Sequence, residues 1–151
     1  NQLLKTTPQI ANQYKRSMLK PGDILITIRG TVGRTCVVPE ELSGANITQD
    51  TARLAIIPDL NSGYVIWFLN TTWSQNWMTR KMVGQAVKGI NLGDLKELPV
   101  PIPPIALQNQ FAEKVKEIEA QKEKQKQSAS QLDILFSSLF LPFILSFKVL
   151  M

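Results

Sequence analysis

The clearest hydrophobic pattern lies in the C-terminal third of the chain, where apolar residues recur at alternating intervals of three and four. This spacing places them in one stripe along a helix, so it predicts a coiled-coil helix over 105–140. Such a helix would be roughly 50 Å long at ~1.5 Å per residue, and it needs a partner helix to cover its stripe. Lys122 and Gln125 interrupt the pattern, which predicts weaker or more selective pairing in the middle. The predicted seam residues are Leu107, Phe111, Val115, Ile118, Leu132, Phe136 and Leu139.

Four prolines stand immediately before this helix, at positions 99, 101, 103 and 104. Each proline ring fixes φ and removes an amide donor, so the segment 99–104 is predicted to be extended. Pro104 can also begin the helix, because the first helical amide needs no partner. We therefore expect a folded domain over 1–98, a connection over 99–104, a helix over 105–140 and an apolar tail over 141–151 of undefined structure.

Alternating and β-branched residues in the domain predict two strands on either side of Gly30 and Gly33. Arg29 and Arg34 flank these glycines at the turn. Two guanidinium groups on a glycine turn can bind phosphate or the edge of guanine. An ordinary solvent-exposed hairpin explains the same pattern equally well.

A polar turn over 46–50 precedes another apolar strand, which ends at Pro58. Asn46 and Gln49 in this turn carry amides that can bind adenine, although both are also common turn residues. The stretch 64–82 then has helical spacing and is predicted to be one helix packed on the sheet. Its three tryptophans are expected to lie mainly in the core.

Two cations, Arg80 and Lys81, end this helix, and a glycine-rich loop with Gln85 and Lys88 follows. Cations at a helix C-terminus are favourable for the helix dipole alone, but this loop belongs to the same basic domain as the hairpin. Together the elements predict an α+β fold, with a mixed β-sheet, a packed helix and then the long helix.

Composition and charge narrow the classes of function. With 44% hydrophobic and 19% charged residues, a chain of 151 residues can bury one core. The single cysteine, Cys36, excludes an intramolecular disulfide, and the lack of histidine excludes a histidine-based triad or zinc site. Segment 1–98 has eleven basic and seven acidic residues, and this excess is compatible with a polyanionic partner.

Two other interpretations remain open but have weaker support. Asp59, Asp94 and Lys96 resemble the carboxylate and lysine set of metal-dependent nucleases, but Asp94 is predicted to lie in a glycine loop. The apolar segment 134–151 is interrupted by Pro142 and Lys148 and is too short beyond the seam to span a membrane. We expect this tail to pack on a partner or to be an aberrant terminus, and we expect no metal, cofactor or membrane.

The order and spacing of several short motifs resemble the DNA specificity subunit of type I restriction-modification systems. The resemblance covers Leu19 to about Leu139. The chain departs from the family pattern at both ends. The sequence before Leu19 is too short for the domain's opening strands, which predicts an N-terminally incomplete domain. The apolar tail is the second departure. The motifs are Gly22-Asp23-Ile24-Leu25-Ile26, Arg29-Gly30-Thr31-Val32-Gly33, Gly89-Ile90, Leu95 to Leu98, and Pro101-Ile102-Pro103-Pro104 with Gln108, Gln110 and Phe111.

The resemblance implies a cytoplasmic, non-catalytic subunit that reads one half of a split sequence in double-stranded DNA. Long helices in that family act as a ruler and as docking surfaces for methyltransferase (M) subunits, and chemistry resides in the M and restriction (R) subunits. A complete subunit has two domains and two helices, so a natural half-length subunit would form a homodimer through its helix. A coiled-coil assembly module without DNA specificity is the alternative. The implied DNA-binding residues are Arg29, Thr31, Arg34, Asn46, Gln49, Arg80, Lys81, Gln85 and Lys88.

Overall fold

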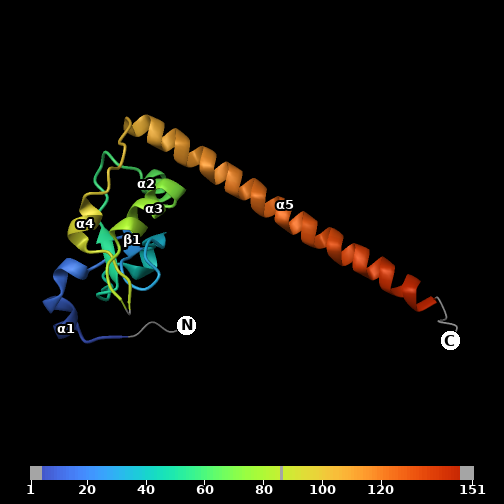
Figure 1. Ribbon diagram of the computed structural model, residues 1–151, viewed down its shortest axis with the longest axis horizontal. Coiled ribbons are helices and arrows are strands. Elements are labelled where there is room, and N and C mark those ends of the chain that lie inside the picture. Colours follow the sequence, from blue (N-terminus) through green and yellow to red (C-terminus); the bar gives the residue numbers. More distant parts are fainter. Residues whose placement is uncertain (1–4, 86, 147–151) are drawn as a thin grey trace. The chain divides into compact units, whose positions relative to one another are not determined.

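The computed structural model describes residues 5–85 and 87–146 of the chain (Figure 1). The chain divides into two compact units, Asn1–Ala112 and Glu113–Met151. The first unit contains the described strands, and the described part of the second is the continuation of one long helix. The predicted α+β fold is confirmed.

Three short antiparallel strands form the sheet of the first unit, in the order β2-β1-β3. These are β1 (Ile24–Thr27), β2 (Thr35–Val37) and β3 (Thr51–Leu54). The predicted hairpin is confirmed, because β1 pairs with β2. The prediction of a mixed sheet is wrong for the described strands: β3 also pairs antiparallel with β1. The connection over 38–50 contains only the short 3₁₀ helix Glu40–Leu42, and it lacks the crossover helix typical of parallel neighbours.

Two helices replace the single helix predicted over 64–82. They are α2 (Ser62–Leu69) and α3 (Thr72–Lys81). The break falls at Thr71, whose hydroxyl accepts a hydrogen bond from the backbone N–H of Ser74 at 3.3 Å and so caps a new helix. The remaining short helices of this unit are α1 (Pro8–Gln13), the 3₁₀ helix Lys15–Ser17 and α4 (Leu92–Lys96).

The core of the first unit comprises two apolar clusters, with Trp77 packed against both. Trp67 and Trp73 expose 43% and 52% of their surfaces, so the prediction that the tryptophans are mainly core is wrong for these two. The first cluster contains Ile26, Ile28, Ala52, Met78, Ile90 and Leu95, and the second contains Ile24, Tyr64, Val65, Leu69 and Leu98.

The long helix α5 runs over Ile105–Ser146 and includes the first residues of the predicted tail. Its first two turns belong to the first unit, where Phe111 packs against Trp67 and Tyr64 with ring centroids 4.6 and 5.8 Å apart. Phe111, a predicted seam residue, is therefore a packing contact of the first unit. The tail residues 147–151 lie outside the described residues.

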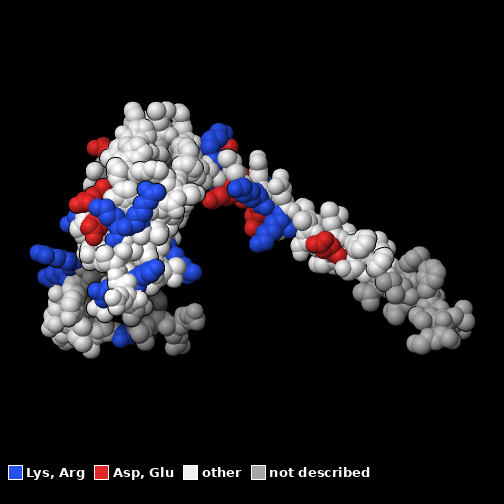
Figure 2. Space-filling model, viewed as in Figure 1, with Lys and Arg blue, Asp and Glu red and all other residues white. Residues whose placement is uncertain are grey.

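The second unit has mixed charges followed by apolar residues. Figure 2 shows basic and acidic side chains interspersed along the N-terminal half of α5. From Gln127 to Ser146 the helix has a single charged residue, Asp133. Ile118, Leu132 and Leu139 are 51%, 66% and 74% exposed. Nowhere in residues 5–85 and 87–146 is a helix long and apolar enough to cross a membrane.

Candidate nucleic-acid interface

Three loops that are distant in the sequence meet beside the end of β1. They are the hairpin tip (28–34), the polar turn (46–50) and the glycine loop (83–89). The backbone N–H of Ile28 donates to the carbonyl of Asp50 at 2.8 Å, which joins the tip to the polar turn. The N–H of Gly30 donates to the carbonyl of Lys88 at 3.0 Å, which joins the tip to the glycine loop. The tip is thus hydrogen-bonded to both neighbours.

Two glycines allow the glycine loop to fold back and approach the tip. Val83 and Gly89 exchange two backbone hydrogen bonds, of 2.8 and 3.0 Å. Gly84 has φ +113°, and a Cβ there would collide with the carbonyl oxygen of Val87. A Cβ at Gly89 would lie 3.0 Å from the carbonyl oxygen of Ile28. Larger residues at these positions would therefore disturb the loop or its contact with the tip.

The other side of the hairpin tip is fixed by side chains. The Thr27 hydroxyl donates to the carbonyl of Thr31 and accepts a hydrogen bond from the N–H of Arg34 at 3.1 Å. Gln75 on α3 donates from Nε2 to the carbonyl of Gly33 at 3.1 Å. Arg34 thus extends from a backbone that is held by both the hairpin and α3.

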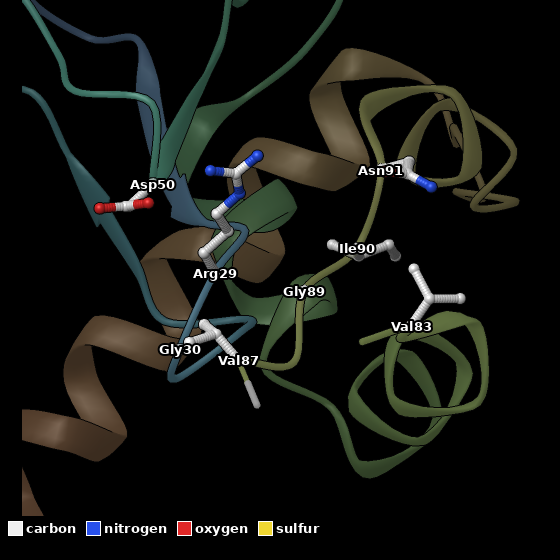
Figure 3. Close-up of a pocket in the computed structure, with 8 residues that line it drawn as sticks. All are labelled: Arg29, Gly30, Asp50, Val83, Val87, Gly89, Ile90 and Asn91. Carbon is white, nitrogen blue, oxygen red and sulfur yellow. The ribbon is translucent and has the colours of Figure 1, made fainter. Parts of the chain in front are cut away.

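A pocket with a volume of about 600 Å³ opens where the tip and the glycine loop meet (Figure 3). In this view Arg29 extends from the tip toward the part of the pocket where Asp50 and Asn91 lie on either side. Valine and isoleucine side chains form another part of the wall. The lining residues are Arg29, Gly30, Asp50, Val83, Val87, Gly89, Ile90 and Asn91.

The cations of the interface fall into two groups. Arg29, Arg34, Arg80 and Lys88 are exposed, and none forms an ion pair with an acidic residue of the described chain. Their charges are available to a ligand.

Lys81 is already engaged within the first unit. Its Nζ lies 2.9 Å from Oε2 of Glu97 and 5.4 Å from the centroid of the Trp77 ring. The hydrogen bond that Lys81 donates to Glu97, together with the negative charge of that carboxylate, raises the pKa of Lys81 above its ordinary value. Lys81 therefore ties the end of α3 to the end of α4.

The amide residues also differ from one another. Nδ2 of Asn46 donates to the carbonyl of Tyr14 and to the hydroxyl of Ser17, both at 3.0 Å. These bonds attach the N-terminal segment to the polar turn and use both donors of this amide. Gln49 and Gln85 are exposed on their loops. The loops therefore bring together Arg29, Thr31, Arg34, Gln49, Gln85 and Lys88, whereas Arg80 and Lys81 lie at the end of α3, just before the glycine loop.

Sequence reasoning missed two polar residues of the pocket. Asp50 ends the predicted polar turn over 46–50, but only Asn46 and Gln49 were named as candidate residues of that turn. Asn91 stands at the N-cap of α4, where an asparagine usually caps the helix, yet its side chain makes no capping hydrogen bond. An exposed asparagine that does not cap its helix is recognisable only from the structure.

Acidic residues do not gather elsewhere into a candidate metal site. Across the described parts of the chain, no group of three or more cysteine, aspartate or glutamate side chains is placed to hold a metal ion. Of the two carboxylates in the nuclease alternative, Asp94 lies within α4 and Asp59 lies in the loop before α2.

Comparison with known proteins agrees with the family resemblance of the sequence motifs. The family model for the type I restriction modification DNA specificity domain matches residues 1–133. The type I restriction enzyme EcoBI specificity subunit of Escherichia coli is 35% identical over 123 residues, which cover 78% of this chain and 25% of that protein. The chain thus spans about a quarter of the length of this curated relative.

Proposed function

The chain belongs to the family of type I restriction modification DNA specificity domains, and on this premise we propose that its first unit reads one half of a two-part target in duplex DNA. The family model describes a specificity domain and not a catalytic one. Methylation and cleavage would be carried out by M and R subunits, in the cytoplasm.

The observation that most strongly supports the proposal is that the hairpin tip is hydrogen-bonded to both the polar turn and the glycine loop. Backbone hydrogen bonds of 2.8 and 3.0 Å hold these loops together, so their side chains can meet one surface of DNA. Arg29, Arg34 and Lys88 lie on these loops, and none of them forms an ion pair with an acidic residue of the described chain. Preorganised loops lose little entropy on binding, which favours recognition.

Two kinds of contact are expected at this surface. Lys88 and Arg34 would bind phosphates, which gives affinity and register but no sequence information. Arg29, Gln49 and Gln85 would contact base edges in the major groove, where each base pair presents its own pattern of donors and acceptors. Arg80 and Thr31 would contact the sugar-phosphate backbone beside the glycine loop and the tip.

The apolar stripe of α5 supports a second part of the proposal, which concerns protein partners. Leu132, Phe136 and Leu139 expose 66%, 65% and 74% of their surfaces on a helix that is the sole element in the described part of its unit. Exposed apolar residues at this spacing favour a partner helix. We place here both docking of M subunits and, in a half-length subunit, antiparallel pairing with a second copy.

Selection of duplexes from a randomised pool by the full chain would test DNA reading. A short enriched sequence is expected, and the logarithm of its affinity should fall linearly with the logarithm of salt concentration. The alternative, a coiled-coil assembly module without DNA specificity, predicts that no sequence is enriched. Circular dichroism on the same sample would establish that the chain is folded.

A further inference from the structure

The pocket beside the hairpin tip combines an arginine with an aspartate, and neither side chain forms an ion pair within the described chain. Arg29 and Asp50 both line this pocket of about 600 Å³. Both residues are exposed, and neither forms an ion pair with another residue of the described chain. A donor group and an acceptor group therefore belong to residues that line the same pocket (Figure 3).

The backbone fixes these two residues relative to each other. The carbonyl of Asp50 accepts a hydrogen bond from the N–H of Ile28 at 2.8 Å, and Arg29 is the next residue. Arg29 also pairs with Gly89 as an isolated antiparallel bridge. The two side chains thus start from anchored positions on neighbouring strand-like segments.

An aspartate on a DNA-binding surface needs a specific reason, since phosphates repel its charge. In the major groove, guanine presents O6 and N7 as acceptors, and its partner cytosine presents the N4 amino group as a donor. The guanidinium of arginine fits guanine, and a carboxylate can accept from cytosine N4.

Resting on the proposed function, we infer that Arg29 and Asp50 together read one G·C base pair, with Arg29 on guanine and Asp50 on the cytosine amino group. The pair also disfavours A·T and C·G, whereas T·A offers the arginine one acceptor, thymine O4, in place of the two on guanine. Opposite thymine, the carboxylate would face the O4 acceptor, and opposite adenine N6 or cytosine N4 the arginine would face a donor. Once DNA covers these groups, leaving them unpaired costs binding free energy, so the pocket discriminates between base pairs at a single position.

The remaining wall of the pocket favours this reading. Val83 and Val87 are 58% and 63% exposed, and Ile90, which also lines the pocket, is 3% exposed. When DNA covers these valines, water leaves the pocket and the charged hydrogen bonds strengthen in the lower dielectric. Asn91, without a capping bond, lies at the same opening and can contact the neighbouring base.

The test uses the full chain and the duplex enriched by selection, modified one base at a time. Replacing guanine by 7-deazaguanine removes the N7 acceptor, and replacing cytosine by N4-methylcytosine removes the amino hydrogen in the major groove. At one G·C pair, both changes should weaken binding by the unsubstituted chain, on the order of tenfold each.

Substitutions then assign each modification to its residue. Arg29→Ala should abolish sensitivity to 7-deazaguanine at that pair, and Asp50→Ala should abolish sensitivity to N4-methylcytosine, while each retains the other sensitivity. Arg29→Lys keeps a charged donor for guanine N7 and O6 but loses the planar fork, so it should retain part of the sensitivity to 7-deazaguanine. Arg16→Ala and Asp59→Ala make the same charge changes at exposed positions outside the pocket and should retain both sensitivities.

Two results would overturn the inference, and they differ in what they imply. If selection enriches a sequence but no G·C pair shows both sensitivities, or the substitutions do not remove them selectively, the pocket does not read G·C, although the chain still reads DNA. If no sequence is enriched by the folded chain, the proposed function itself fails.

Discussion

Gln108 accepts a hydrogen bond at its Oε1 from the backbone N–H of Asn61, at 3.0 Å, and so joins the first turn of α5 to the loop before α2. Its Nε2 donates to the carbonyls of Asp59 and Pro103, at 3.0 and 2.7 Å. Gln108 is 0% exposed, so its buried amide is fully used by groups of the first unit. This residue anchors the start of the long helix to the rest of the first unit.

Replacing Gln108 by leucine should therefore destabilise the first unit. The change leaves one buried N–H and two carbonyls without this partner, and an unsatisfied buried polar group costs about 1–3 kcal/mol. Urea unfolding followed by tryptophan fluorescence would measure the loss. The matched control is Gln110→Leu, two residues further along α5 at an exposed position, where a change within about 0.5 kcal/mol is expected. Equal effects of the two substitutions would contradict the anchoring role.

The contact between the glycine loop and the hairpin tip gives a second prediction. In Gly89→Ala, the new methyl group would lie 3.0 Å from the carbonyl oxygen of Ile28 and 3.2 Å from Cγ of Arg29. The loop must move away from the tip, so affinity for the selected duplex should fall several-fold. Fluorescence anisotropy would measure the affinity. Gly93→Ala, at a glycine with open space around it, should leave the affinity unchanged, and a similar loss there would refute the explanation.

A feature of the fold could be predicted from the sequence where neighbouring residues alone determine it. The hairpin around Gly30 and Gly33 was predictable because strand pattern and turn are local. The break at Thr71 was missed because helical spacing continues across it, and only the capping bond to Ser74 shows where α3 begins. Exposure of Trp73 depends on what packs nearby, which its own sequence neighbourhood does not specify.

The candidate site was predictable as three loops but not as one surface. The hydrogen bond between Gly30 and Lys88 joins residues that are far apart in the chain, and no local pattern indicates it. For the same reason, the sequence could not show that Asn46 is used by Tyr14 and Ser17. Asp50 lies in the predicted polar turn, but only the fold shows that it lines the same pocket as Arg29.

A third prediction separates the two lysines of the interface. Lys88→Ala should weaken binding to all duplexes alike and reduce the slope of log affinity against log salt by about 0.9, the value for one lost phosphate contact on B-DNA. Lys81→Ala should change this slope less, because Nζ of Lys81 is already paired with Glu97 at 2.9 Å. Anisotropy titrations at several salt concentrations give both slopes. A larger slope change for Lys81 than for Lys88 would contradict this division of roles.

The last prediction concerns the apolar stripe in the second unit. Leu132 and Phe136 are 66% and 65% exposed, and the ring of Phe136 stacks on Phe140 with centroids 5.3 Å apart, which extends one apolar face along α5. If this face pairs with a second helix, the full chain should self-associate at micromolar concentrations, and Phe136→Glu should shift it toward monomer in sedimentation equilibrium, because a carboxylate cannot be buried in the seam without cost. Ser130→Glu introduces the same charge on the opposite side of the helix and should leave association intact. A chain that is monomeric and folded before any substitution would exclude self-pairing and leave M subunits as the expected partner for this face.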